Sequence, residues 1–138
     1  MKEAEIKDRV DSLIESVGLV KESTHKLPSE LSGGMRKRVG LGRALALEPE
    51  IMLYDEPTTG LDPITTKMVN DLIKSTAEKN KEKKLTSIII SHDIQATLKI
   101  SDYIAFLERG HILEYCPTEE FKKSTHPTIR KFLDLTSH

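Results

Sequence analysis

Two short apolar runs that each end in polar residues constrain the fold of this chain more than any other feature. The first is Ile51–Tyr54, which leads directly into Asp55 and Glu56, and the second is Thr86–Ile90, which is followed two residues later by His92. Continuous apolar runs of this length are typical of parallel strands that are covered on both faces. Because ligands bind beyond the carboxyl ends of such strands, Asp55, Glu56 and His92 are candidate functional residues.

Helical patterns precede and separate the two runs. An apolar stripe predicts a first helix that ends near Gly18, and Ser32 is a good N-cap for a second helix over residues 35–47. Asp62, with proline at the next position, predicts the start of a third helix. The inward residues of the first helix are Ile6, Val10, Leu13, Ile14 and Val17.

The last part of the chain continues in short elements. Residues 94–100 predict a helix, residues 103–107 and 111–115 predict a hairpin around a Glu-Arg-Gly turn, and Phe121 and residues 129–133 fall in short terminal helices. This alternation predicts an α/β layer structure, and a chain of this length has room for at most one hydrophobic core.

Charge and composition exclude several classes of protein. Lys and Arg number 21 and Asp and Glu number 22, so we expect neither nucleic acid nor an anionic membrane as the main partner. The charged run at 79–84 is interpreted as a solvated loop. Apolar runs such as Ile88–Ile90 are far too short to span a bilayer, so no direct membrane insertion is expected. Cys116 is the single cysteine and the five histidines have no ligand spacing, which argues against a disulfide or a zinc site.

A glycine-rich segment precedes the second helix. It offers a hydroxyl, two residues without side chains and a helix N-terminus, which together allow backbone N–H groups to approach a phosphate closely. Taken alone, such a segment is more often only a cap and a turn. Its residues are Leu31, Ser32, Gly33, Gly34 and Met35.

The acidic pair after the first strand suits nucleotide hydrolysis. In Asp55-Glu56, one carboxylate would hold Mg²⁺, and the neighbouring carboxylate would orient or deprotonate the attacking water. His92 could hydrogen-bond a γ-phosphate or the catalytic carboxylate. Two adjacent acids can also form an ordinary solvated turn, and a lone histidine is usually structural.

In this order the motifs together resemble the nucleotide-binding domain of ATP-binding-cassette (ABC) transporters. Residues 31–34 look like the family signature, residues 51–55 like Walker B, Glu56 like the catalytic glutamate and His92 like the switch histidine. A further segment looks like the D-loop, namely Gly60, Leu61 and Asp62.

The resemblance covers essentially the whole chain and implies a partial P-loop NTPase fold with a parallel-strand core and flanking helices. Residues 1–47 would form part of the helical subdomain and the signature helix. Residues 48–138 would carry Walker B, the D-loop, the switch histidine and the C-terminal elements. The resemblance also implies ATP and Mg²⁺ as cofactors, a second ABC ATPase domain whose ATP contacts residues 31–35, and a membrane permease that holds the protein at the cytoplasmic side of the membrane.

The phosphate-binding loop of such domains has no counterpart in the sequence. No Gly-x-x-x-x-Gly-Lys-Ser/Thr occurs, and no residue is a candidate for the Q-loop glutamine of the family. We therefore expect no ATPase activity from the chain alone. Family topology also implies that the edge of the strand at Thr86–Ile90 lacks its neighbour, which would leave an apolar edge exposed.

Three points stay open at this level. The run Met35–Val39 looks most like the branch that powers lipid movement with Mce-type substrate-binding proteins. A non-transport ABC protein of translation or DNA repair is an alternative, although no second cassette, coiled coil or basic surface supports it. A catalytically silent fragment that only binds a partner cassette is the other.

Overall fold

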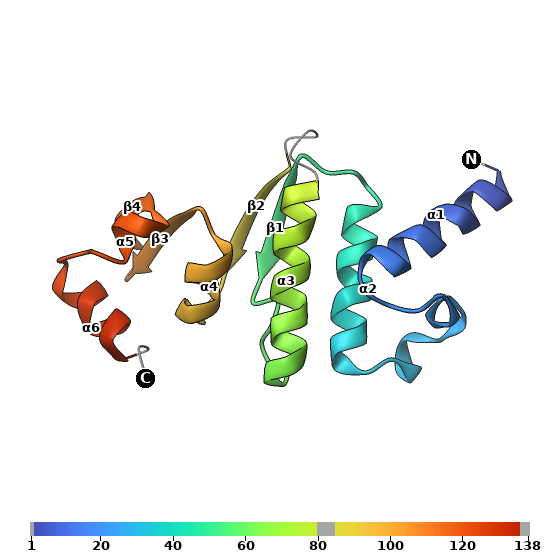
Figure 1. Cartoon of the computed structure of the whole chain (residues 1–138), viewed down its shortest axis with the longest axis horizontal. Coiled ribbons are helices and arrows are strands. Elements are labelled where there is room, and N and C mark those ends of the chain that lie inside the picture. The colour runs from blue at the N-terminus through green and yellow to red at the C-terminus, as the bar shows by residue number, and fades with distance from the viewer. Residues whose placement is uncertain (1, 80–84, 136–138) are drawn as a thin grey trace. The chain divides into compact units, whose positions relative to one another are not determined.

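The computed structural model describes residues 2–79 and 85–135 of the chain. These residues form two compact units, one that extends to Ile90 and one that begins at Ser91 (Figure 1). The first unit contains helices, two 3-10 turns and a parallel strand pair, and the second contains a hairpin and three short helices. The α/β class predicted from the sequence is therefore confirmed.

The first unit starts with two helices and continues as strand, helix, strand. Its elements are α1 (Glu3–Ser16), η1 (Lys21–His25), η2 (Pro28–Glu30), α2 (Gly33–Leu45), β1 (Ile51–Asp55), α3 (Pro63–Lys79) and β2 (Thr86–Ile90). β1 and β2 pair in parallel, from Ile51 opposite Thr86 to Asp55 opposite Ile90. Both predicted strands and their parallel pairing are thus present. The predicted charged loop falls mostly on residues 80–84, which lie outside the described residues.

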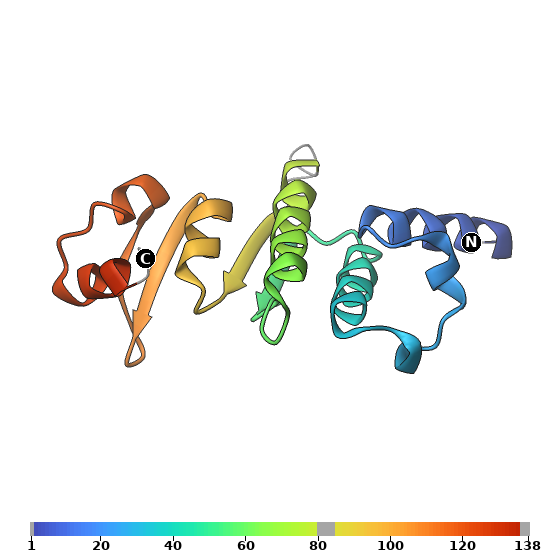
Figure 2. The same ribbon diagram turned by 60° about the horizontal axis from the view of Figure 1, so that its bottom comes forward.

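Only one face of this strand pair is covered by described residues of the first unit. Met52 and Tyr54 of β1 are buried in the first core, and α3 lies along that face of the sheet (Figures 1 and 2). Residues with the opposite orientation are mostly exposed. Leu53, for example, is 74% exposed and Ile88 is 52% exposed. The prediction of strands covered on both faces is therefore wrong for this face within the first unit, because no described element of that unit packs over it.

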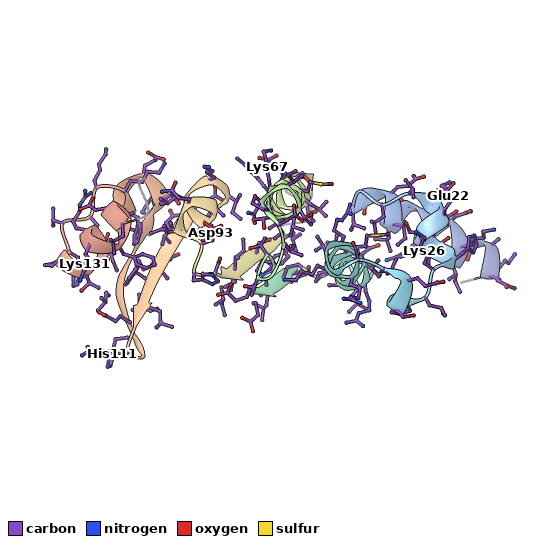
Figure 3. All side chains as sticks on the ribbon, turned by 90° about the horizontal axis from the view of Figure 1, so that it is seen from below. Glu22, Lys26, Lys67, Asp93, His111 and Lys131 are labelled. Atoms are coloured by element: carbon purple, nitrogen blue, oxygen red, sulfur yellow. The ribbon has the colours of Figure 1, made fainter. Side chains whose placement is uncertain are left out.

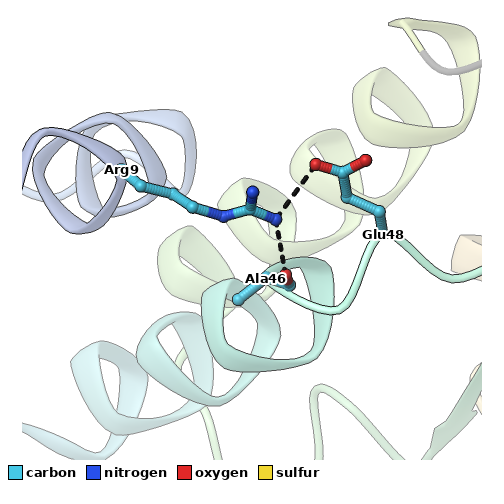
Figure 4. Close-up of polar contacts among 3 residues, drawn as sticks. All are labelled: Arg9, Ala46 and Glu48. Atoms are coloured by element: carbon cyan, nitrogen blue, oxygen red, sulfur yellow. Dashed lines mark hydrogen bonds and ion pairs between the residues drawn. The ribbon is translucent and has the colours of Figure 1, made fainter. Parts of the chain in front are cut away.

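The core of the first unit joins α1, α2, β1 and α3. Its buried members are Val17, Leu19, Leu41, Met52, Tyr54, Val69 and Ile73. α1 is fixed at the end of α2, because Arg9 donates to the carbonyl oxygen of Ala46 at 2.7 Å and to Glu48 Oε1 at 3.0 Å (Figure 4). Ile6 and Val10, which the helical pattern predicts to face inward, are 48% and 42% exposed. Only the C-terminal half of the predicted apolar stripe is therefore used in this core.

The second unit is built around an antiparallel hairpin. Its elements are α4 (Ile94–Ile100), β3 (Tyr103–Glu108), β4 (His111–Pro117), α5 (Thr118–Phe121) and α6 (Pro127–Leu135). Arg109 and Gly110 form the turn with φ of +48° and +80°, as the Glu-Arg-Gly signal predicts. The buried residues that form its core are Ile94, Ile104, Phe121, Ile129 and Leu133.

The two units have separate buried clusters, which differs from the single core expected from chain length. The described residues form two sheets of two strands each, and no strand is shared between them. The core residues accordingly fall into two sets without a shared member. Among the described residues, no helix is both long and apolar enough to cross a membrane.

Candidate functional site

The glycine-rich segment forms the start of α2. The Ser32 side chain accepts a hydrogen bond from the Met35 amide at 3.3 Å, and the Ser32 carbonyl accepts one from Arg36 at 2.9 Å. The predicted N-cap is confirmed, and the helix includes Gly33 and Gly34 and ends at Leu45. Ser32 and Gly33 are exposed, so backbone N–H groups at this helix N-terminus are accessible to an anion.

The second glycine of this segment packs against the first turn of α3. A Cβ atom on Gly34 would lie 2.5 Å from Cγ2 of Thr65, whereas a Cβ atom on Gly33 would meet nothing within 4 Å. Gly34 therefore allows a close contact between two helices. The sequence alone suggests that both glycines let backbone N–H groups approach a phosphate closely, and the packing role of Gly34 differs from this.

The acidic pair lies at the carboxyl end of β1, as predicted. Asp55 is the last residue of the strand and is exposed, whereas Glu56 is half-buried and has a φ of +47°. The Glu56 amide donates to the carbonyl oxygen of Ile90 at 3.0 Å, and Thr59 Oγ1 donates to Glu56 Oε2 at 2.9 Å. The backbone and the carboxylate of Glu56 are thus both held in place.

Lys37 on α2 contacts the same segment and was not singled out by the sequence. Its Nζ donates to the carbonyl oxygen of Thr59 at 2.7 Å and to that of Glu56 at 3.4 Å. Lys37 follows Gly34 by three residues, which places both on one face of the helix. This spacing could have identified Lys37 as a neighbour of the glycine-rich segment. It does not predict which residues that face of the helix contacts.

The predicted D-loop connects the acidic pair to α3. Gly60 has a φ of +76°, and the Leu61 amide donates to the carbonyl of Thr58 at 3.1 Å. Asp62 caps α3: Oδ1 accepts from the amides of Ile64 and Thr65, each at 3.1 Å, and Oδ2 accepts from Thr65 Oγ1 at 2.6 Å. These hydrogen bonds, led by the Thr65 hydroxyl, lower the pKa of Asp62 below its ordinary value.

A pocket of about 270 Å³ adjoins the acidic pair. Asp55, Glu56, Lys37 and Tyr54 are among the residues that line it, together with apolar side chains of α2, β1 and α3. Burial raises the pKa of Tyr54, and nearby Ser87 partly opposes this rise. The Tyr54 hydroxyl lies near Ser87 but makes no hydrogen bond of good geometry. The pocket is thus mainly apolar, with polar groups at the end of β1.

The carboxylates fit Mg²⁺ that arrives with a nucleotide better than a metal held by protein alone. Mg²⁺ bound to nucleotides usually takes one or two carboxylates and completes its shell with phosphate oxygens and waters. Asp55 offers one exposed carboxylate of this kind. In the described ranges, no group of three or more His, Cys, Asp or Glu residues could hold a metal ion.

His92 belongs to the second unit and lies two residues beyond β2. It is exposed and directly precedes Asp93, whose side chain caps α4 by accepting from the Ala96 amide at 3.0 Å (Figure 3). The Asp93 amide donates a hydrogen bond to Ser91 Oγ at 3.1 Å, which further fixes the position of Asp93. The contact of His92 with a nucleotide or with Glu56 stays a prediction.

Comparisons with known proteins place these features in a wider context. Residues 1–59, which include the glycine-rich segment and the acidic pair, match the family model described as ABC transporter. The chain is 43% identical over 136 residues to the methionine import ATP-binding protein MetN of Xanthomonas campestris pv. campestris, an alignment that covers 98% of the chain and 39% of the relative. It is 40% identical over 133 residues to the probable ribonucleotide transport ATP-binding protein mkl of Mycobacterium leprae, covering 96% of the chain and 37% of that relative.

A solved structure also has the same fold. The dimeric post-hydrolysis state of the ATP-binding cassette MJ0796 bound to ADP and Pi matches with a TM-score of 0.73 and 30% identity. This match covers 86% of the present chain and 49% of the solved chain. The chain therefore spans about two fifths of the length of the curated relatives and about half of the solved cassette.

Proposed function

We propose that this chain, which has the fold of an ABC ATPase domain over the part that it covers, contributes signature and Walker B functions to the ATP-hydrolysing subunit of a membrane transporter. The observation that carries the proposal is the arrangement within the first unit. An accessible helix N-terminus with Ser32 and Gly33 and the carboxylates at the end of β1 belong to one packed unit, joined by Lys37.

Each motif has a distinct role in this proposal. Asp55 would hold Mg²⁺, which would neutralise phosphate charge when bound with ATP. Glu56 would accept a proton from the attacking water, or orient that water, and His92 would hydrogen-bond the γ-phosphate. The residues that would contact ATP held by a second ABC domain are Leu31, Ser32, Gly33, Gly34 and Met35. Gly60, Leu61 and Asp62 would form the D-loop beside that partner.

The proposal requires a polypeptide that supplies the phosphate-binding loop. No such loop occurs in this sequence, and the relatives extend well beyond the matched region. The exposed apolar face of the β1–β2 pair supports this requirement, since parallel sheets are usually covered on both faces. The loop would come either from a separate chain or from another segment of a longer protein.

The permease and the cargo are further parts of the proposal. The relatives named as import and transport ATP-binding proteins support a membrane permease as partner and a position at the cytoplasmic face of the membrane. The run Met35–Val39 suggests a lipid or another hydrophobic cargo. The name of the MetN relative favours methionine, and the name of the mkl relative a ribonucleotide.

ATP turnover in a complementation assay tests the proposed activity. The chain is measured alone, with an N-terminal cassette half that carries a phosphate-binding loop, and with that half plus Glu56→Gln. We expect turnover only in the mixture, and a loss of about 10²-fold or more with Glu56→Gln because a general base is removed. Glu50→Gln is the matched control, since Glu50 is exposed and lies before β1. Silence of every mixture containing folded chain would favour the binding-module alternative.

The cargo is tested in cells that lack the gene for this chain. Uptake of labelled methionine, uptake of labelled ribonucleotide and retention of labelled phospholipid are compared with and without a plasmid copy. A defect restored only for phospholipid would support the lipid prediction. Restoration only for methionine or ribonucleotide would overturn it.

A further inference from the structure

We infer that Lys37 is a positioning residue that holds segment 56–62 against α2 and thereby fixes the backbone from which the Glu56 carboxylate projects. The inference rests on the proposed function for its catalytic meaning, because Glu56 is the proposed base. Its structural content is independent of that function and can be measured separately.

The contact itself is specific and charge-assisted. Lys37 is a half-buried residue, and its ammonium donates to two carbonyl oxygens of one turn, that of Thr59 at 2.7 Å and that of Glu56 at 3.4 Å. The same Glu56 carbonyl accepts the Thr59 amide at 3.3 Å, which closes the turn. Hydrogen bonds from an ionised donor are stronger than those between neutral groups. Lys37 therefore stabilises this turn from outside the loop.

The backbone of Glu56 needs such support. Its φ of +47° lies in the left-handed region, which is unfavourable for a residue with a long side chain. Hydrogen bonds to its amide, its carbonyl and its carboxylate oppose this tendency around Glu56. The amide donates to Ile90, the side chain accepts from Thr59 Oγ1, and the carbonyl accepts from Lys37. Of these three partners, only Lys37 connects Glu56 to α2.

A second contact joins the far end of the segment to the same helix. Gly34 packs against Thr65, and Thr65 in turn donates its hydroxyl and its amide to Asp62. Because Gly34 and Lys37 share one face of α2, both ends of the 56–62 segment are held by one helical surface. The anion-accessible start of α2 and the Glu56 carboxylate are consequently parts of one packed body.

The test is amide hydrogen exchange in the whole chain with Lys37→Met, which keeps the length of the stem and removes the ammonium. Loss of a hydrogen bond from a charged donor should accelerate exchange at the amides of Thr59 and Leu61 by about tenfold or more. Lys67→Met is the matched control, because Lys67 is exposed and pairs with Asp71 one turn away on α3, at 2.6 Å. Lys37→Arg should restore most of the protection. Unchanged exchange at Thr59 and Leu61 in folded Lys37→Met would overturn the inference.

The wild-type chain provides a second measurement that does not depend on how the variant folds. We expect slow exchange of the Lys37 ammonium protons by NMR and a coupling across the hydrogen bond from Nζ to the Thr59 carbonyl carbon. A freely rotating ammonium with the averaged signal of exposed lysines would contradict the inference.

Kinetics in the complementation assay then separate positioning from nucleotide binding. Lys37→Met should lower kcat by about tenfold and leave the KM for ATP within about twofold, because Lys37 holds the turn that presents Glu56. A rise of about tenfold in the KM for ATP without a change in kcat would contradict the positioning role. If wild-type mixtures show no turnover, the proposed function fails, whereas the exchange and NMR results still decide the structural inference.

Discussion

At the scale of single residues, the two adjacent glycines of the α2 start have different roles. A Cβ atom at position 34 would lie 2.5 Å from the Thr65 side chain, so Gly34→Ala must displace either Thr65 or α2. We expect Gly34→Ala to destabilise the fold by about 1–3 kcal/mol, as for other overpacked contacts. Gly33→Ala is the control, because its Cβ atom meets nothing within 4 Å. Urea unfolding measures both, and equal effects at the two positions would contradict the close contact.

Asp62 makes stability depend on pH in a defined direction. Its pKa is lowered in the folded state, chiefly by the Thr65 hydroxyl and amide. The stabilisation is therefore fully present above the unfolded-state pKa, about 3.9, and is lost as the pH falls through the lower folded-state value. We expect Asp62→Asn to be less stable than wild type at pH 6 and to approach wild-type stability near pH 2. Urea unfolding at the two pH values measures this, and a gap that stays constant would show that the Asp62 charge contributes nothing.

At the scale of elements, α2 contains a glycine that its packing does not require. Gly40 lies in the helix interior, and a Cβ atom there would meet nothing within 4 Å. Gly40→Ala should therefore stabilise the chain by about 1 kcal/mol through helix propensity. Gly60→Ala should have the opposite sign, by about 1 kcal/mol, because Gly60 has a φ of +76°. Thermal unfolding distinguishes the two, and a destabilising Gly40→Ala would show that the helix needs glycine for a contact outside the described residues.

The elements that sequence predicts well are those with local causes. The caps at Ser32 and Asp62 depend on residues within three positions, and the hairpin turn depends on Arg109 and Gly110. The contact from Lys37 to Thr59 spans 22 residues, so its partner could not be read from the pattern around Lys37. The sequence also does not predict the open face of the β1–β2 pair. An apolar strand has the same sequence whether or not another element covers its second face.

At the scale of the whole molecule, both units expose apolar side chains on their sheets. In the first unit these include Leu53 and Ile88, and in the second Leu107 and Ile112 are 67% and 62% exposed. The stacked rings of Tyr103 and Tyr115, with centroids 5.6 Å apart, extend the hairpin surface. Exposed apolar side chains that share one face of a sheet are typical of interaction surfaces. The proposed need for further polypeptide therefore extends from the first unit to the second.

Leu53 offers a direct test of that requirement, because it is 74% exposed on the open face of β1. A charge there adds little strain to the isolated chain, but it would have to be buried when another polypeptide covers the face. We expect Leu53→Glu to leave the urea midpoint of the chain nearly unchanged, to reduce self-association in analytical ultracentrifugation, and to abolish complementation by the N-terminal half. Leu47→Glu is the control, since Leu47 is 83% exposed and lies between α2 and β1. Full complementation by Leu53→Glu would mean that this face stays open in the assembled ATPase.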